Sequence, residues 1–416
     1  MKIGVLTIGN ELISGRIADT NTSTIARLTW QMNWPLVVSL CVGDDDDMIS
    51  RALSFALSHA QAVVVTGGLG PTSDDITTAA IAKALNLSLY TDEEVLGGLR
   101  DLFQKYNLTW TENNAKQAVF PVGAEILPNP IGTAPGFALR YQDRHIFVIP
   151  GVPREAERMM RDQVIPRLLT YTGEEKAFPW SRTLKTFGLS EAAVDEALKD
   201  IDFRSMGISI GFYPHFPENH IVISTVGEKD EAKERLAQGE REITARLGRY
   251  IFAYDGETLE GNIGALLRKL GLTIAVAESC TGGLITDRLT DIPGSSDYVE
   301  RGFVTYSNRA KTELLGVSPE TIKRFGAVSE ETAREMAQGA RNKAQTHLGL
   351  AVTGIAGPTG GSEEKPVGTV FIAISDDKGT SCRRHQFRWE RRRNKIITAT
   401  TALFTLLNHL KNRHED

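Results

Sequence analysis

The sequence predicts an α/β protein with two α/β/α sandwich domains joined by a small α+β middle domain. Over residues 1–170, short apolar runs alternate with amphipathic helical stretches, and the same alternation returns over residues 256–416. Such alternation is typical of a sheet with helices on both faces. Residues 171–255 instead combine a few strand-like runs with one long charged helical stretch. The length of 416 residues agrees with about three domains.

The composition excludes several classes of protein. Hydrophobic residues make up 41% and charged residues 24% of the chain, as in ordinary globular proteins. A net charge of -5 gives no electrostatic reason to expect nucleic acid or a membrane as partner. No apolar run approaches the roughly 20 residues of a membrane span, and the first residues lack the layout of a signal peptide. The three cysteines are far apart and match no disulfide framework or zinc spacing, so we expect a cytoplasmic protein.

The first domain is expected to hold strands at residues 3–8, 36–41, 62–65 and 146–149. In such sheets, ligands bind in the loops that follow the strands. Glu11 follows the first strand so closely that a role as a helix cap explains it poorly. Four aspartates, residues 44–47, follow the second strand and suit the dipole at a helix start. Asp44, the nearest to the strand, is the functional candidate.

Residues 66–75, Thr-Gly-Gly-Leu-Gly-Pro-Thr-Ser-Asp-Asp, are the most informative loop of this half. Its glycines allow a ligand to approach the backbone closely, and the loop leads into a helix whose start can bind phosphate. It has neither the dinucleotide-binding nor the Walker spacing. Asp74 and Asp75 suit magnesium-type ligation beside a phosphate, or else they cap and charge the helix start. Segments 113–117, 132–136 and 150–155 are either plain turns or further loops of the same cleft.

With these motifs, residues 1–170 resemble the amino-terminal domain of the CinA (competence/damage-inducible) family, which is related to molybdopterin-binding proteins. The resemblance implies a metal-dependent ADP-ribose pyrophosphatase with a divalent metal such as Mg²⁺. It implies metal ligation by Glu11, Asp74 and Asp75, and catalytic roles for Asp44 and Asp75. It also implies substrate binding by Gly68, Gly70 and Thr72.

The middle domain is expected to begin with a linker at residues 173–176. Strands are expected at 184–187, 208–212 and 220–226, and helices at 191–198 and 231–247. This unit resembles the KH-like middle domain of longer CinA proteins. It lacks the basic Gly-x-x-Gly loop that clamps nucleotides, so RNA binding is not expected. His215 and His220 have no third ligand in view for a metal. We expect a spacer or a dimerisation element.

The last domain centres on residues 274–283, Ile-Ala-Val-Ala-Glu-Ser-Cys-Thr-Gly-Gly. An apolar run over 272–277 predicts a buried strand, residues 280–283 a turn, and residues 284–289 the first turns of a helix. This arrangement lifts the Ser279 hydroxyl to the sheet edge beside free backbone N–H groups. Ser279 is then either a helix cap or a nucleophile. Because no histidine lies near, the base for a nucleophile would be Lys311, whose pKa burial or a neighbouring cation would have to lower.

Further motifs follow in the same domain. Residues 303–311, Phe-Val-Thr-Tyr-Ser-Asn-Arg-Ala-Lys, predict a strand that leads into a helix, with Tyr306 at the junction. The loop 353–361, after a strand at 348–352, can wrap a phosphate or ribose in backbone N–H groups. Strands at 370–374 and 384–387 precede three arginines, 391–393, one of which could bind an anionic group. Helices are expected at 259–269, 330–345 and 396–410.

Through the motifs at 277–283, 306–311, 326–329, 353–358 and 365–369, residues 256–416 resemble the carboxy-terminal domain of the CinA family, the nicotinamide mononucleotide (NMN) deamidase family. The resemblance implies that Ser279 is the nucleophile and Lys311 its partner, assisted by Tyr306 and Thr353, with no cofactor. The substrate-binding residues that it implies are Cys280, Thr281, Gly282, Gly283, Gly354, Gly357 and Arg391.

The sequence therefore predicts an amidohydrolase that converts NMN and water to nicotinic acid mononucleotide and ammonia by a Ser–Lys mechanism. A second activity on ADP-ribose is expected in the first domain. The family also suggests a homodimer. The competing interpretation is a pterin- or nucleotide-binding scaffold, linked to competence or DNA damage, with no turnover.

Overall fold

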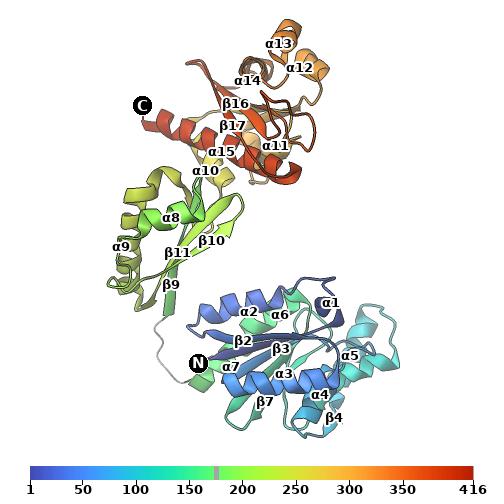
Figure 1. Cartoon of the computed structure of the whole chain (residues 1–416). Helices are drawn as coiled ribbons and strands as arrows, with labels where there is room; N and C mark the ends of the chain where they lie inside the picture. The colour runs from blue at the N-terminus through green and yellow to red at the C-terminus, as the bar shows by residue number, and fades with distance from the viewer. Residues whose placement is uncertain (173–177, 416) are drawn as a thin grey trace. The chain divides into compact units, whose positions relative to one another are not determined.

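The computed structural model describes residues 1–172 and 178–415, so the linker predicted at 173–176 lies outside the described residues. Residues 1–180 with 226–232 form one compact unit, and residues 181–225 with 233–416 form the other. Figure 1 shows the elements of both units along the chain. Among the described residues, no helix is long and apolar enough to cross a bilayer.

The first domain is built on a six-stranded mixed sheet with the strand order β2-β1-β3-β8-β7-β6. The first four strands in this order are parallel, and β7 and β6 run antiparallel to their neighbours. All six residues of β1 are buried, because helices cover both faces of the sheet there. The strand bounds are β1 (Ile3–Ile8), β2 (Leu36–Val42), β3 (Ala62–Thr66), β6 (Glu125–Leu127), β7 (Gly136–Tyr141) and β8 (Arg144–Ile149), with a separate pair, β4 (Leu89–Thr91) and β5 (Val119–Pro121).

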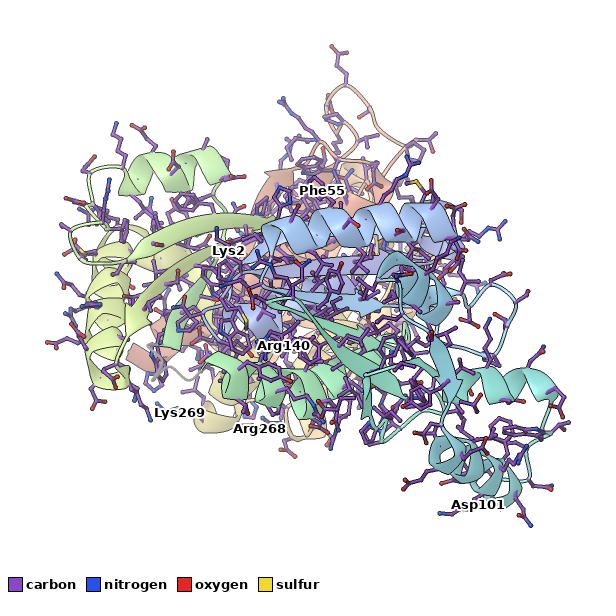
Figure 2. The ribbon with its side chains drawn as sticks, turned by 90° about the horizontal axis from the view of Figure 1, so that it is seen from below. Lys2, Phe55, Asp101, Arg140, Arg268 and Lys269 are labelled. Atoms are coloured by element: carbon purple, nitrogen blue, oxygen red, sulfur yellow. The ribbon has the colours of Figure 1, made fainter. Side chains whose placement is uncertain are left out.

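Two helical layers sandwich this sheet (Figure 1). The helices α3 (Asp46–His59) and α4 (Thr77–Ala84) share a hydrophobic core with one face. The helices α2 (Asn21–Trp30) and α6 (Pro153–Met159) share a core with the other face. Phe55 on α3 is instead 51% exposed and lies on the outer side of its helix (Figure 2). The remaining helical segments are α1 (Asn10–Ile13), α5 (Glu93–Lys105), η1 (Glu112–Ala118), η2 (Met160–Val164) and α7 (Ile165–Thr172).

The run of four aspartates after β2 divides into different roles. Asp45 is the N-cap of α3, and its carboxylate accepts a hydrogen bond from Met48 N at 2.9 Å. Asp46 and Asp47, in the first turn, form ion pairs with Lys83 and Arg51. Only Asp44 among the four lines a cavity beside the sheet. The helix-start explanation therefore holds for three aspartates and leaves Asp44 for the site.

The middle domain is a four-stranded antiparallel sheet, β10-β11-β9-β12, with the long helix α9 and the shorter α8 (Figure 1). Along β11, buried residues alternate with partly buried ones, as expected for a sheet with one covered face. The bounds are β9 (Phe178–Phe187), β10 (Ser209–His215), β11 (Glu218–Gly227), β12 (Ile251–Tyr254), α8 (Glu191–Leu198), α9 (Lys229–Leu247) and η3 (Gly248–Tyr250).

The last domain holds a five-stranded mixed sheet with the order β14-β13-β15-β16-β17. The strands β14, β13 and β15 are parallel, and β16 and β17 are antiparallel. One face packs on α10, α11 and α15, and the other on α14. The bounds are β13 (Ile274–Glu278), β14 (Val299–Val304), β15 (Leu348–Gly354), β16 (Thr369–Ser375), β17 (Thr380–Gln386), α10 (Leu259–Leu270), α11 (Leu284–Thr290), η4 (Ser295–Asp297), α12 (Asn308–Leu315), α13 (Pro319–Phe325), α14 (Glu330–Ala344) and α15 (Arg391–Glu415). The predicted α/β class, with its α+β middle domain, is confirmed.

Candidate active sites

A cavity of about 610 Å³ lies at the carboxyl ends of the parallel strands in the first domain. All seven site residues that the sequence predicts in the first domain line this cavity. Residues from the later loops, which the sequence interpreted as either turns or parts of the cleft, also line it. The predicted lining residues are Glu11, Asp44, Gly68, Gly70, Thr72, Asp74 and Asp75, and the later loops add Gln117, Thr133, Pro150 and Glu155. The segments 113–117, 132–136 and 150–155 therefore belong to one cleft.

The glycine–aspartate loop is held by its own side chains. The Asp75 carboxylate accepts hydrogen bonds from Thr72 N at 2.8 Å and from Thr72 Oγ1 at 2.6 Å. A Cβ at Gly70 would lie 2.6 Å from Asp75 Oδ2, so only glycine allows this carboxylate its position. Gly68 has a positive φ of 65°, and a Cβ there would collide with the Thr77 hydroxyl at the start of α4. The two glycines are therefore explained by the shape of the loop as well as by ligand approach.

Asp44 is the acid whose environment in this cavity is most perturbed. Its carboxylate accepts a hydrogen bond from Asn10 N at 2.9 Å, which lowers its pKa. Burial and the neighbouring charges of Glu11, Asp74 and Asp75 have the larger combined effect, and they raise the pKa of Asp44 above its usual value. With Asp19 and Glu155, six acidic residues line this cavity, where a cation or a cationic transition state would be stabilised.

Two buried amide groups face the same cavity and were not recognised as site residues from the sequence. Asn21 and Gln117 are only 8% and 6% exposed, and both line the cavity. Their nitrogens are used: Asn21 Nδ2 donates to Gly151 O, and Gln117 Nε2 donates to Thr133 Oγ1. Their oxygens have no hydrogen-bond partner among residues 1–172 and 178–415. Because a buried polar atom without a partner is costly, these oxygens are suited to accept hydrogen bonds from a ligand.

The predicted metal ligands partly fit a divalent cation. Within residues 1–172 and 178–415, no three or more His, Cys, Asp or Glu side chains are grouped so that they could hold a metal ion by themselves. Glu11, Asp74 and Asp75 therefore line the cavity without forming a closed ligand set. Mg²⁺ is commonly held by one or two carboxylates together with substrate phosphates and water. The donor set suits that open kind of site, in which the substrate completes the coordination.

In the last domain, the chain leaves β13 and turns sharply into α11. The Glu278 carboxylate at the end of β13 is completely buried. It accepts hydrogen bonds from Gly283 N and Ile285 N at 3.0 Å, and from Thr286 N at 2.9 Å. These N–H groups belong to the start of α11, where an acid also complements the helix dipole. Sequence reasoning did not assign this role to Glu278.

The turn between β13 and α11 requires glycine. Gly282 and Gly283 have φ values of 65° and 98°, the left-handed region that other residues rarely adopt. The Thr281 hydroxyl is buried in this turn and, among the residues that the structure describes, has no hydrogen-bond partner. Lys395 on α15 approaches the turn from the other side, with its Nζ 3.5 Å from where a Cβ at Gly282 would lie. Sequence reasoning, which considered only the three arginines at the start of α15, missed Lys395.

Ser279 and Lys311 are in direct contact. Lys311 Nζ lies 3.0 Å from Ser279 Oγ and also donates to the Thr305 carbonyl at 2.8 Å. The lysine is only 1% exposed, and this burial lowers its pKa from 10.5 to about 8. Ser279 N bonds to Val352 O, so the serine backbone is fixed at the end of β13. The pair thus places a hydroxyl beside an amine that can lose its proton near neutral pH.

Cys280, the next residue, cannot compete as a nucleophile. Its side chain is buried, and burial raises the pKa of its thiol to about 12. The thiolate is therefore negligible at neutral pH. This leaves the Ser279 hydroxyl as the activated group of the turn.

The other predicted residues surround the pair with different degrees of contact. Tyr306 lies beyond the end of β14, is 64% exposed, and accepts a hydrogen bond from Arg391 Nη2 at 3.1 Å. Arg391 Nη1 also donates to Gly357 O at 2.6 Å, which ties the start of α15 to the loop after β15. Thr353 is fully buried, and its hydroxyl donates to Ala327 O at 2.7 Å. Arg393 instead stacks on Phe216 and Trp389, so Arg391 is the arginine of the three that reaches this loop.

Fold and sites together define a class of three-domain α/β protein, in which an acid-lined cleft and a buried Ser–Lys pair lie in separate domains. Family models match residues 4–170 as a probable molybdopterin binding domain, residues 181–253 as the damage-inducible protein CinA KH domain, and residues 256–410 as the CinA C-terminal domain. The chain belongs to the CinA family.

Relatives match along nearly the whole chain. A CinA-like protein from Syntrophus aciditrophicus is 54% identical over 413 residues, which cover 99% of this chain and 98% of the relative. A CinA-like protein from Desulfosudis oleivorans is 43% identical, covering 98% of this chain and 99% of the relative. The crystal structure of the competence/damage inducible protein CihA from Agrobacterium tumefaciens is 47% identical over 36% of this chain and 96% of its own, with a TM-score of 0.34.

Proposed function

We propose that the last domain hydrolyses the carboxamide of NMN to give nicotinic acid mononucleotide and ammonia. The observation that carries this proposal is the 3.0 Å contact between Ser279 Oγ and a buried lysine whose pKa is lowered to about 8. A neutral lysine beside a serine is a nucleophile–base pair that needs no histidine. The family resemblance of these residues to NMN deamidases supplies the substrate.

In this mechanism the neutral Lys311 amine accepts the proton of Ser279 as the serine oxygen bonds to the carboxamide carbon. Backbone N–H groups of the turn after Ser279 stabilise the oxyanion that develops on the carboxamide oxygen. Lys311 then returns its proton to the departing nitrogen, and ammonia leaves an acyl-serine. Water attacks this ester, Lys311 accepts the water proton, and the acid product leaves as Ser279 regains its proton. The direct contact makes relay through Tyr306 unnecessary.

Substrate orientation is assigned to the basic end of α15. Arg391 bridges Tyr306 and the Gly357 carbonyl, and the fork of a guanidinium suits a phosphate. Lys395 lies one turn further along the same helix, near Gly282. We infer that the two cations bind the NMN phosphate and so direct the carboxamide toward Ser279. The Thr281 hydroxyl, without a partner in the turn, is then free to bond to the substrate.

The test is ammonia release from NMN in the presence of a metal chelator, measured as a function of pH. The base must be neutral, so kcat/KM should fall about tenfold for each pH unit below the Lys311 pKa of about 8 and level off above it. Ammonia and nicotinic acid mononucleotide should form in equal amounts. No release at any pH, or a rate that is flat through this range, would contradict the proposal.

We further propose that the first domain hydrolyses the pyrophosphate of ADP-ribose. The supporting observation is the cleft in which burial, together with the neighbouring charges of Glu11, Asp74 and Asp75, raises the pKa of Asp44. A divalent metal, when bound, would neutralise the pyrophosphate and lower the pKa of a bound water. Glu11, Asp74 and Asp75 would hold it. Asn21 and Gln117 would accept hydrogen bonds from ribose hydroxyls or the base, since their amide oxygens lack partners.

Asp44 and Asp47 provide a matched pair for testing this second activity. Asp44→Asn keeps an oxygen for the Asn10 N–H but removes the charge, and we expect it to lower metal-dependent AMP release from ADP-ribose about a hundredfold. Asp47→Asn removes the same charge from the surface pair with Arg51, and its effect should stay within about twofold. Equal rates for both variants would exclude Asp44 from catalysis. Nucleotide binding without AMP release by wild type would favour the scaffold interpretation.

A further inference from the structure

A second cavity, larger than the first, shares no lining residue with the acid-lined cleft of the first domain. Its volume is about 820 Å³, and the middle sheet and the last domain line it together, within one compact unit. None of Ser279, Lys311, Tyr306, Thr353 and Arg391 is among its lining residues. The volume falls in the range of small-molecule binding sites, roughly 300 to 1,000 Å³. The function proposed above leaves this cavity without a role.

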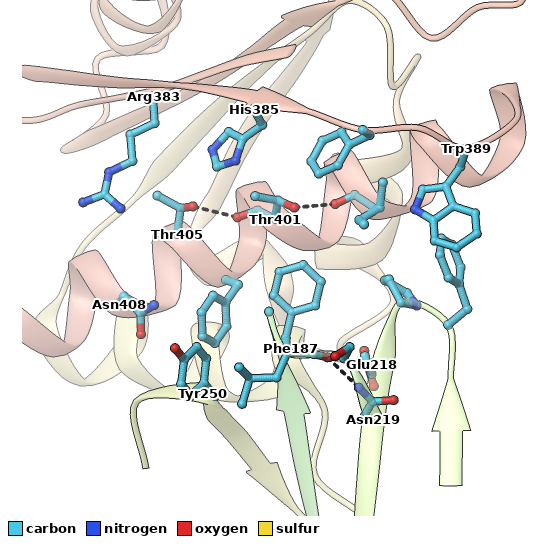
Figure 3. A pocket seen from close by; sticks show the side chains of 18 of the residues that line it. Phe187, Glu218, Asn219, Tyr250, Arg383, His385, Trp389, Thr401, Thr405 and Asn408 are labelled. Carbon is cyan, nitrogen blue, oxygen red and sulfur yellow. Dashed lines mark hydrogen bonds between the residues drawn. The ribbon is translucent and has the colours of Figure 1, made fainter. Parts of the chain in front are cut away.

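Aromatic rings form much of its wall. Phe187 and Tyr250 come from the middle domain and Trp389 from the last domain (Figure 3). Phe387 and Phe404 of the last domain also line the cavity. The ring centroids of Phe187 and Phe404 are 5.3 Å apart with their planes tilted by 60°, so the two domains are in aromatic contact at this cavity. Walls of this kind suit a flat ring system, which can stack between them.

Two polar groups on β17 point into this aromatic space. Alternate residues of a strand face opposite sides of its sheet, so Arg383 and His385 face the cavity and Arg384 faces away. Within the described part of the chain, the buried His385 Nε2 has no hydrogen-bond partner. Burial also lowers the His385 pKa, which keeps the imidazole neutral at physiological pH. A purely apolar ligand would leave this nitrogen unpaired, so the ligand ring should carry a hydrogen-bonding atom.

Charge defines the other end of the ligand. Arg383 lines the cavity and, among the described residues, its guanidinium makes no hydrogen bond or ion pair. Glu191 and Glu218 lie on the middle-domain side, where Glu218 already contacts His220 at 3.1 Å. An anionic group would therefore be attracted to Arg383 and repelled by the opposite side. A guanidinium fork beside a free space suits phosphate in particular.

We propose that this cavity binds a mononucleotide, with its base stacked between the aromatic walls and bonded to His385, and its phosphate paired with Arg383. A nucleobase has both the flat face and the edge of donors and acceptors that the walls and the imidazole require. Asn408 on α15, which also lines the cavity, lies within the same wall as Thr401 and Thr405 and can bond to sugar hydroxyls (Figure 3). This binding site is independent of either proposed activity.

The test is photolabelling of the whole chain with 8-azidoadenosine monophosphate, followed by mapping of the labelled peptides. Mapping separates this cavity from any nucleotide bound near Ser279 or Asp44. We expect label in β17, in residues 401–412 of α15 or around Tyr250, displaced by unlabelled AMP, whereas label at residues 391–395 would report the site near Ser279. The uncharged probe 8-azidoadenosine should label the same segments at least about tenfold less efficiently, because it has no phosphate for Arg383.

Neighbouring arginines supply the matched variants. Arg383→Met should raise the probe concentration for half-maximal labelling about tenfold or more. Arg384→Met, whose side chain bonds to Glu364 O on the other side of the sheet, should leave it within about twofold. His385→Phe keeps a stacking ring but removes the nitrogen and should also weaken labelling. Thermal unfolding checks that each variant is folded. Label confined to other segments, equal labelling by the two probes, or equal behaviour of the two arginine variants would overturn the assignment.

Discussion

Ser279→Ala is expected to abolish ammonia release from NMN, with a loss in kcat of about 10,000-fold or more, as for other essential nucleophiles. The reason is that the acyl-enzyme requires the Ser279 oxygen, and the adjacent Cys280 thiol cannot replace it because its pKa is raised to about 12. Ammonia assay of the purified variant against wild type measures the effect.

Binding should separate this chemical loss from damage to the fold. The hydroxyl is not part of the Glu278 network that holds the turn, so Ser279→Ala should still bind NMN with an affinity within about threefold of wild type. Its melting temperature should also be close to that of wild type. Turnover near the wild-type rate would show that Ser279 is a helix-terminus residue and not the nucleophile.

Lys311→Met is expected to reduce kcat by a similar factor, again about 10,000-fold, because the serine would lose the base that contacts it. Methionine approximates the length of the lysine stem and removes the amine from a site that is 1% exposed. The residual rate should also lose the dependence on pH below about 8 that Lys311 gives the wild type. Kinetics at several pH values measure both effects.

Two further variants sharpen this experiment. Lys311→Arg retains a positive charge but cannot become neutral, so it should be as inactive as Lys311→Met if the amine acts as a base. An active arginine variant would mean that only the charge matters. Lys323→Met, on the exposed surface of α13, is the control for loss of a lysine and should retain activity. The double variant of Ser279 and Lys311 should lose little more than either single one, since the two residues act as a unit.

The order of elements was largely predictable because buried strands and amphipathic helices leave different periodicities. The strands that sequence reasoning missed are short or lie where a motif suggested only a loop. β6 has three residues, and β7 begins at Gly136, the last residue of a segment interpreted as a turn. β14 begins at Val299, earlier than predicted, because a partly exposed edge strand with Glu300 and Arg301 lacks an apolar signature. Because β14 ends at Val304, Tyr306 lies beyond that strand.

The residues of the candidate site could be predicted where the type of residue and its motif are enough to indicate a chemical role. Ser279 and Lys311 are identified by their motifs, but their contact across 32 residues follows only from the parallel pairing of β13 with β14. The role of Glu278 could not be predicted, because the sequence does not show that the N–H groups at the start of α11 would bond to its carboxylate. The amide oxygens of Asn21 and Gln117 likewise become available only because the folded loops occupy their nitrogens.

Phe187, Phe252 and Ala253 of the middle sheet belong to the same continuous hydrophobic core as the helices α10 and α15. The family models divide the chain between residues 253 and 256, but this core extends across that division. The boundary between the family models and the boundary of the packed hydrophobic core therefore differ. The middle domain matches a sequence family of its own, but part of its sheet is buried in the core of the last domain. The middle sheet is for that reason as much a structural wall of the last domain as a domain in its own right.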